Sequence, residues 1–189
     1  MFKHLVLLVL CIHLSGCVSV VAVGAAGTAA VSASDRRTVG TQIDDKTTEA
    51  RVNAAVNDVV AIDDNAAISV HVYNGQVLLT GQAKIQQIID AASRAAASVA
   101  NVNKVHNQVR LGSPIPATAT MNDIWLGTKI RTLMTAEEKV PLLKLDLIVE
   151  DSEVFIMGQL TKSEATAAVD IARNVQGVSK VVRVMELLN

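Results

Sequence analysis

Side chains that could carry out chemistry are few in this chain and lie far apart. The chain has two cysteines, Cys11 and Cys17, and four histidines, of which only His71 and His106 follow Cys17. A zinc or catalytic centre needs three or four ligands that converge on one point. Neither histidine has a cysteine or a carboxylate pair at ligand spacing, so we interpret both as strand residues. We expect no metal site, no cofactor and no catalytic residues.

Two acidic pairs, Asp44-Asp45 and Asp63-Asp64, lie near the ends of expected helices. Charge at a helix terminus or solvation in a loop explains them better than acid–base catalysis. No serine lies in a Gly-x-Ser-x-Gly setting. The sequence therefore favours a protein that is not an enzyme.

The remaining chemistry lies at the N-terminus and concerns Cys17. Lys3 precedes an apolar run over residues 5–14, which is the layout of a secretory signal peptide and is far shorter than the roughly 20 residues of a membrane-spanning helix. The run ends in Leu14-Ser15-Gly16-Cys17, which resembles the bacterial lipobox. The resemblance implies cleavage after residue 16 and acylation of the Cys17 thiol, palmitate included. The alternative is an ordinary secreted protein with a chance cysteine.

The residue after the cysteine bears on where the protein goes. In lipoproteins of Gram-negative bacteria an aspartate at this position favours retention at the inner membrane, and here the residue is Val18. The resemblance therefore implies an outer-membrane protein, lipid-anchored and facing the periplasm. The segment 18–34 carries no charge and contains Gly24 and Gly27, which weaken a helix. We expect a flexible tether of about 20 residues, able to reach at most ~70 Å.

The composition of the mature chain limits its fold and its partners. Removing 16 of 189 residues leaves 173, with 16 basic and 18 acidic side chains and a formal charge of −2. Nothing in that balance favours nucleic-acid binding. Aromatic residues make up only 2% of the chain, so the core must consist of Val, Leu, Ile and Ala. That composition suits two small domains better than one large one.

The elements that would position these residues repeat at an offset of about 77 residues. In each copy a turn pair, Asn74-Gly75 or Asp151-Ser152, joins two β-rich runs, which predicts a hairpin. Helical segments are expected at 84–100 and 163–175. The matching segments are residues 51–56 with 129–134, 74–82 with 151–159, and 101–105 with 177–181. Each copy therefore reads helix, strand, strand, helix, strand.

The repeat predicts a division of the chain into five parts. A linker is indicated by Pro114 and Pro116 among small residues. The expected parts are a signal peptide at 1–16, the lipidated Cys17 with its tether at 17–40, a first domain at 41–111, the linker at 112–120, and a second domain at 121–189.

The αββαβ order, the strand pattern that ends in Gly81 or Gly158, and a closing Val-x-x-Val resemble BON domains. Two of them behind a lipobox resemble the dual-BON outer-membrane lipoproteins of the DolP (YraP) type. The resemblance implies an α+β fold, with the helices of each domain packed on one face of a three-stranded mixed sheet. It also implies phospholipid binding, a role in outer-membrane integrity, and gathering at division sites. We interpret both glycines as structural, since glycine permits a bend or a close backbone approach.

The most informative segment for function is the expected helix over residues 122–134. Its apolar stripe, which should face the sheet, consists of Leu126, Ile130, Leu133 and Met134. Trp125 lies about 100° around the helix from Leu126. Its helical neighbours are Thr128, Lys129 and Thr132, with Arg131 on the flank. An indole beside a lysine suits a bilayer interface. The alternative is that Trp125 caps the core or packs on the linker.

The two repeats differ at this helix. The first has Thr47 where the second has Trp125. Residues 44–58 carry a net charge of −2, whereas residues 121–134 carry +1. We therefore predict that the second domain binds anionic, phosphatidylglycerol-like phospholipid and has no small-molecule substrate. The alternative is a periplasmic adaptor that binds outer-membrane assembly, division or cell-wall remodelling proteins.

Overall fold

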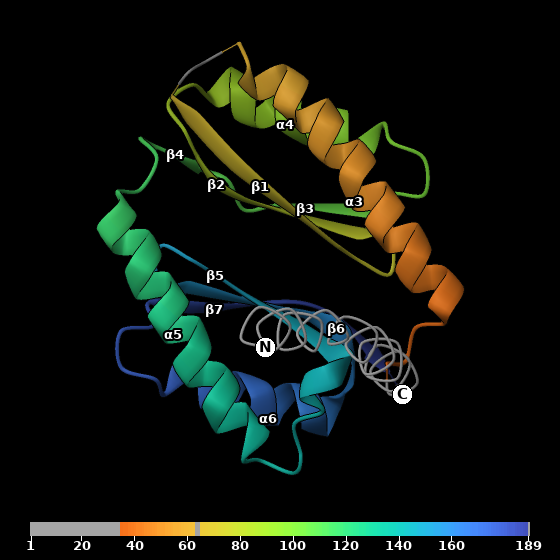
Figure 1. The fold of residues 1–189 in the computed structure, drawn as a ribbon, viewed down its shortest axis with the longest axis vertical. Coiled ribbons are helices and arrows are strands. Elements are labelled where there is room, and N and C mark those ends of the chain that lie inside the picture. Colours follow the sequence, from red (N-terminus) through yellow and green to blue (C-terminus); the bar gives the residue numbers. More distant parts are fainter. Residues whose placement is uncertain (1–34, 63–64, 189) are drawn as a thin grey trace, which may run out of the picture. The chain divides into compact units, whose positions relative to one another are not determined.

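The computed structural model describes residues 35–62 and 65–188. The predicted signal peptide, Cys17, most of the expected tether and the pair Asp63-Asp64 lie outside the described residues. Both predicted domains lie within residues 37–189, which form one compact unit of the chain. There the order helix, strand, strand, helix, strand occurs twice (Figure 1). The predicted α+β fold with two tandem αββαβ domains is confirmed.

The first domain runs from helix α3 to strand β4. Its elements are α3 (Val39–Val60), β1 (Ala66–Tyr73), β2 (Gln76–Ala83), α4 (Gln86–Ala97), β3 (Lys104–Asn107) and β4 (Arg110–Leu111). Strand β2 pairs antiparallel with β1 and parallel with both β3 and β4. The last two are pieces of one expected strand, interrupted where the Asn107 side chain accepts a hydrogen bond from the Val109 N–H at 3.1 Å. This sheet therefore has four strands rather than the three expected.

The second domain repeats this order with an unbroken last strand. Its elements are α5 (Ala117–Thr135), the 3-10 turn η1 (Leu142–Lys144), β5 (Leu145–Glu150), β6 (Glu153–Thr161), α6 (Lys162–Arg173) and β7 (Lys180–Leu188). Strand β6 lies between β5 and β7, antiparallel to the first and parallel to the second. Helix α5 begins at Ala117, five residues before the start that the sequence pattern suggested, inside the expected linker.

Both hairpin turns have the geometry that the sequence pattern predicts. Asn74 and Gly75 have φ values of 51° and 71°, and Asp151 and Ser152 have 47° and 64°. Positive φ at both central residues defines the type I′ turn, which matches the twist of the flanking strands. Ser152 adopts this conformation without the freedom of glycine, so the second turn needs support from elsewhere.

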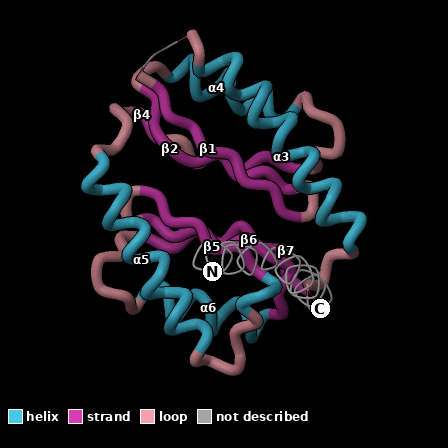
Figure 2. Tube along the Cα trace, in the orientation of Figure 1, coloured by secondary structure: helices cyan, strands magenta, loops and turns pink. Residues whose placement is uncertain are grey.

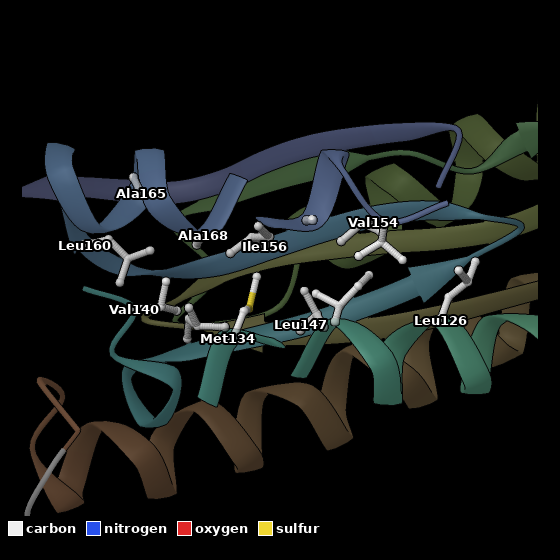
Figure 3. Close-up of a cluster of buried hydrophobic side chains, with 13 residues drawn as sticks. Leu126, Met134, Val140, Leu147, Val154, Ile156, Leu160, Ala165 and Ala168 are labelled. Atoms are coloured by element: carbon white, nitrogen blue, oxygen red, sulfur yellow. The ribbon is translucent and has the colours of Figure 1, made fainter. Parts of the chain in front are cut away.

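The helices of each domain lie on one side of their own sheet (Figure 2). In the second domain α5 contributes Leu126 and Met134 to a core that includes Leu147 from β5 and Ile156 from β6 (Figure 3). Leu126, Ile130 and Met134 are fully buried, as their spacing predicts. Leu133 was expected in the same stripe, but 45% of its surface is exposed. That part of the prediction is wrong because Leu133 lies at the edge of the stripe, where the sheet does not cover it.

The other faces of the two sheets are also buried, and against each other. Tyr73 and Leu78 of the first domain form an apolar cluster with residues of the second, namely Phe155, Met157 and Val184. The Tyr73 hydroxyl donates to the Lys144 carbonyl oxygen at 3.0 Å. Burial on both faces explains why β2 and β6 read as nearly continuous apolar runs instead of alternating ones.

Gly81 and Gly158 occupy equivalent places in the two central strands. Gly81 has a φ of 110°, and a Cβ built on it would lie 2.0 Å from the Ala67 carbonyl oxygen. A Cβ on Gly158 would lie 2.8 Å from the carbonyl oxygen of Lys144. In both strands, therefore, the neighbouring backbone occupies the space of a side chain.

Candidate functional site

Helix α5 is fixed to its own domain by a buried carboxylate. Asp123 is 5% exposed, and its two oxygens accept hydrogen bonds from the N–H groups of Asp151 and Ser152 at 2.7 and 2.8 Å. Burial raises the pKa of Asp123, against the opposing influence of the Ser152 N–H and of Arg110. The carboxylate holds the left-handed hairpin turn and sets the rotation of α5 about its axis.

In the first domain, too, a buried carboxylate accepts hydrogen bonds from the hairpin turn, which the sequence pattern did not predict. Asp45 is buried, and it accepts from the N–H groups of Asn74 and Gly75 at 2.7 and 2.9 Å and from Arg37 at 2.9 Å. Its interpretation as helix-end or loop charge is therefore wrong, whereas its neighbour Asp44 is exposed. The signal was present in the repeat, since Asp45 and Asp123 lie at an offset of 78 residues.

The face of α5 that points away from the domain is apolar. Met121, Ile124 and Trp125 are 71%, 66% and 54% exposed, and their i, i+3, i+4 spacing places them on one side of the helix. We call these three residues the apolar triad. The sequence analysis named only Trp125, because the expected helix began at residue 122 and only residues C-terminal to Trp125 were considered as its neighbours. Starting the helix one turn earlier would have added Met121, whereas Ile124 already lay in the expected helix, directly before Trp125.

Two threonines continue this face toward the C-terminus of α5. The Thr128 hydroxyl donates to the Ile124 carbonyl oxygen at 2.9 Å, and the Thr132 hydroxyl donates to the Thr128 carbonyl oxygen at 3.0 Å. Both hydroxyls therefore have partners within the helix backbone. The face can lose water without leaving these donors unsatisfied.

The two basic residues of α5 have different surroundings. The Lys129 ammonium lies 4.8 Å from the centroid of the Trp125 ring, so a cation borders the apolar triad. The Arg131 guanidinium donates to the Leu147 carbonyl oxygen at 2.6 Å. The structure thus brings Lys129 to the expected face, while Arg131 is bonded to strand β5.

The equivalent helix of the first domain has a different surface. At the offset of 78 residues, Ile124 and Trp125 correspond to Lys46 and Thr47. Lys46 forms an ion pair with Glu49 at 3.2 Å, and the Thr47 hydroxyl donates to the Ile43 carbonyl oxygen at 2.9 Å. The apolar triad therefore has no counterpart at these two positions of α3.

The histidines lie on separate strands of the first domain. His106 Nε2 lies 2.9 Å from the Gln76 side-chain oxygen. Burial lowers the pKa of both histidines, and for His71 the nearby Glu49 and Asp146 act in the opposite direction. Within the part of the chain that the structure describes, no three His, Cys, Asp or Glu side chains gather as a metal-binding group.

None of the helices in residues 35–62 and 65–188 combines the length and apolar character that a bilayer crossing requires.

Comparison with known proteins identifies the family. The BON domain family matches residues 44–113 and 122–189. The chain is 38% identical to the outer membrane lipoprotein DolP of Haemophilus influenzae over 99% of this chain and 96% of that protein. It is 36% identical to a 21 kDa hemolysin of Actinobacillus pleuropneumoniae over 80% of this chain and 78% of that protein. The chain belongs to the family of outer-membrane lipoproteins that carry two BON domains.

Proposed function

We propose that this protein binds anionic phospholipid membranes through the exposed face of α5 and thereby supports the integrity of the outer membrane. The observation that carries the proposal is the apolar triad, Met121, Ile124 and Trp125, with the Lys129 ammonium at its border. Three large apolar side chains exposed together on a helix mark an interaction surface. A bilayer interface satisfies both parts of this face, because the indole lies at headgroup level and the ammonium meets phosphate.

The expected strength of this contact is modest. Full burial of a large apolar side chain contributes about 1.5–3 kcal/mol. Since the triad is about half to three-quarters exposed, its burial would contribute roughly 3–6 kcal/mol before the cost of association is subtracted. A lysine near an anionic leaflet adds about 1 kcal/mol. The acylated Cys17 that we expect would keep the domain near the membrane, so weak binding would suffice.

The difference between the domains supports the assignment to the second one. The paired Lys46 and the polar Thr47 stand at the positions of Ile124 and Trp125. Ile43, at the position of Met121, is exposed, so one of the three apolar side chains has a counterpart. The other two positions carry a threonine and a lysine that is already paired to Glu49. We therefore propose that the first domain contributes little to lipid binding.

Flotation with liposomes tests the proposal on the mature chain with Cys17→Ser, which cannot be acylated. We expect it to float with vesicles that contain phosphatidylglycerol and less with phosphatidylcholine alone. Ile124→Asp and Lys129→Glu should each weaken binding at least tenfold, because one removes an apolar anchor and the other reverses a charge. Thr47→Ala is the matched control and should bind normally. Unchanged binding of both α5 variants would show that another surface contacts lipid.

The proposed link to envelope integrity needs a test in cells. The family resemblance also suggests that the protein acts at division sites. A strain without the protein should admit a large antibiotic that an intact outer membrane excludes. The wild-type gene should restore exclusion, and a gene carrying Ile124→Asp should not, although the variant is present at normal abundance. Full restoration by that variant would favour an adaptor role that needs no lipid contact.

A further inference from the structure

A groove runs between α5 and α6 on the second domain, beside the apolar triad. Its volume is about 580 Å³, which falls in the range of sites that hold small molecules. One wall comes from α5 and the other from α6 and the turn that follows it. The lining residues that matter here are Lys129, Leu133, Ala136, Ile171, Val175 and Gln176.

The chemistry of the groove changes along its length. Leu133, Ile171 and the buried Val175 give it an apolar lining. At one end lies Lys129, whose ammonium also contacts the Trp125 ring. A cation at the end of an apolar trough is complementary to an amphiphile with one anionic group and one alkyl chain.

The two acidic residues that also line the groove are already engaged. Asp170 forms an ion pair with Arg173 at 3.0 Å, and the Glu137 carboxylate accepts from the Lys139 N–H at 3.2 Å. Lys129 has no ion pair among the described residues. The Lys129 ammonium is therefore available to an anionic headgroup at this end of the groove.

We infer that this groove receives one acyl chain of an anionic phospholipid, with the lipid phosphate at Lys129. The inference rests on the proposed function, since Lys129 borders both the apolar triad and the groove. It goes further, because contact with a bilayer surface requires no groove. It also gives a role to Leu133, which lines the groove and is half exposed there instead of joining the core.

Binding in the groove predicts a dependence of affinity on acyl-chain length that adsorption to a membrane surface does not predict. From Lys129 to Ala136 the helix rises about 10 Å, so only the methylenes nearest the headgroup can be enclosed. Each enclosed methylene should strengthen binding about fourfold. The gain should therefore end once the chain is longer than the groove, whereas partition into a bilayer or micelle continues to improve with length.

Titration calorimetry with lysophosphatidylglycerol tests the inference. The ligands carry single saturated chains of increasing length, each kept below its critical micelle concentration, and the protein is the mature chain with Cys17→Ser. Ala136→Phe and Gln176→Phe fill the groove from opposite walls, and both positions are exposed, so the core is undisturbed. Thr166→Phe adds the same ring at an exposed position of α6 that does not line the groove.

The expected result is saturable binding to one site per chain, with affinity that rises with chain length and then levels off. Each groove-filling variant should lose at least tenfold in affinity, and Thr166→Phe should match the wild type. Flotation of the groove variants with phosphatidylglycerol vesicles should persist. If vesicles bind but the monomeric lysolipid does not, or if the groove variants bind it normally, the groove inference is wrong and the proposed function stands. If neither vesicles nor lysolipid bind, both are wrong.

Discussion

The carboxylate of Asp123 should be one of the most important single groups for the stability of the second domain. It is buried and accepts two backbone hydrogen bonds, at 2.7 and 2.8 Å, from a turn whose residues have φ values of 47° and 64°. A hydrogen bond to a charged group contributes about 1.5–3 kcal/mol. Because burial of the carboxylate opposes this gain, we expect Asp123→Ala to lower the free energy of unfolding by about 2–4 kcal/mol. That is a large fraction of the ~5–15 kcal/mol of a typical domain.

Urea denaturation measures this loss, and two further variants sharpen it. Asp123→Asn keeps one acceptor oxygen, so it should lower the free energy of unfolding by roughly half as much as Asp123→Ala. Asp44→Ala, at an exposed aspartate of α3, should stay within about 0.5 kcal/mol of the wild type. In the Asp123→Ala background Ser152→Gly should restore up to about 1 kcal/mol, because glycine adopts the left-handed turn without strain. A loss below about 0.5 kcal/mol for Asp123→Ala would refute the account of the turn.

Three further predictions concern the first domain. Burial lowers the pKa of His71 in the folded chain, so the unfolded chain takes up a proton first as the pH falls through about 6.5, and the free energy of unfolding should fall with it. His71→Gln should reduce this dependence of stability on pH, as measured by urea denaturation between about pH 5 and 7. The Thr80 hydroxyl is buried with no hydrogen-bond partner among the described residues, so Thr80→Val should raise stability by about 1 kcal/mol, and a loss of that size would show that the hydroxyl is satisfied. Gly81→Ala should lower the free energy of unfolding by about 3 kcal/mol or more, because the new Cβ would meet the Ala67 carbonyl oxygen. Gly112 has open space around it, so Gly112→Ala should change that free energy by less than about 0.5 kcal/mol.

Much of the fold could be predicted because the repeat offers each element twice. The Asn74-Gly75 turn is a strong hairpin signal by itself, and it identifies the weaker Asp151-Ser152 turn at the same place in the second copy. Periodicity then identified Leu126, Ile130 and Met134 as core. It failed for Leu133, because a stripe of apolar residues does not show how far the sheet extends beneath its edge.

The contact between the two sheets could not be predicted from either domain alone. The apolar runs of β2 and β6 indicate burial on both faces, but they do not say which surface covers the second face. The partner is the other copy of the same repeat, through Tyr73, Leu78 and Phe155. The roles of Asp45 and Asp123 were hidden for a similar reason, since a carboxylate that accepts from a distant turn has no local sequence signature.

The candidate site was only partly visible in the sequence. Trp125 and Lys129 were identified from helical spacing, and the structure brings them together. Met121 was missed because α5 begins before the point that the repeat suggested. Ile124 lay inside the expected helix but was missed because only residues C-terminal to Trp125 were considered as its neighbours. Arg131, expected on the flank of the site, donates to the backbone of β5. The predicted helix boundary and the choice of helical neighbours therefore limited how much of the site could be predicted from the sequence.

The measurement that tests the central claim most directly is the emission of Trp125 in the presence of phospholipid vesicles. The chain has a single tryptophan, so the signal belongs to the proposed contact alone. The mature chain with Cys17→Ser would be titrated with phosphatidylglycerol vesicles whose acyl chains carry bromine close to the headgroup. Our account predicts a blue shift and strong quenching, both abolished by Ile124→Asp and retained in Thr47→Ala. Emission that keeps its wavelength and intensity while the protein floats with the vesicles would contradict the assignment of lipid binding to α5.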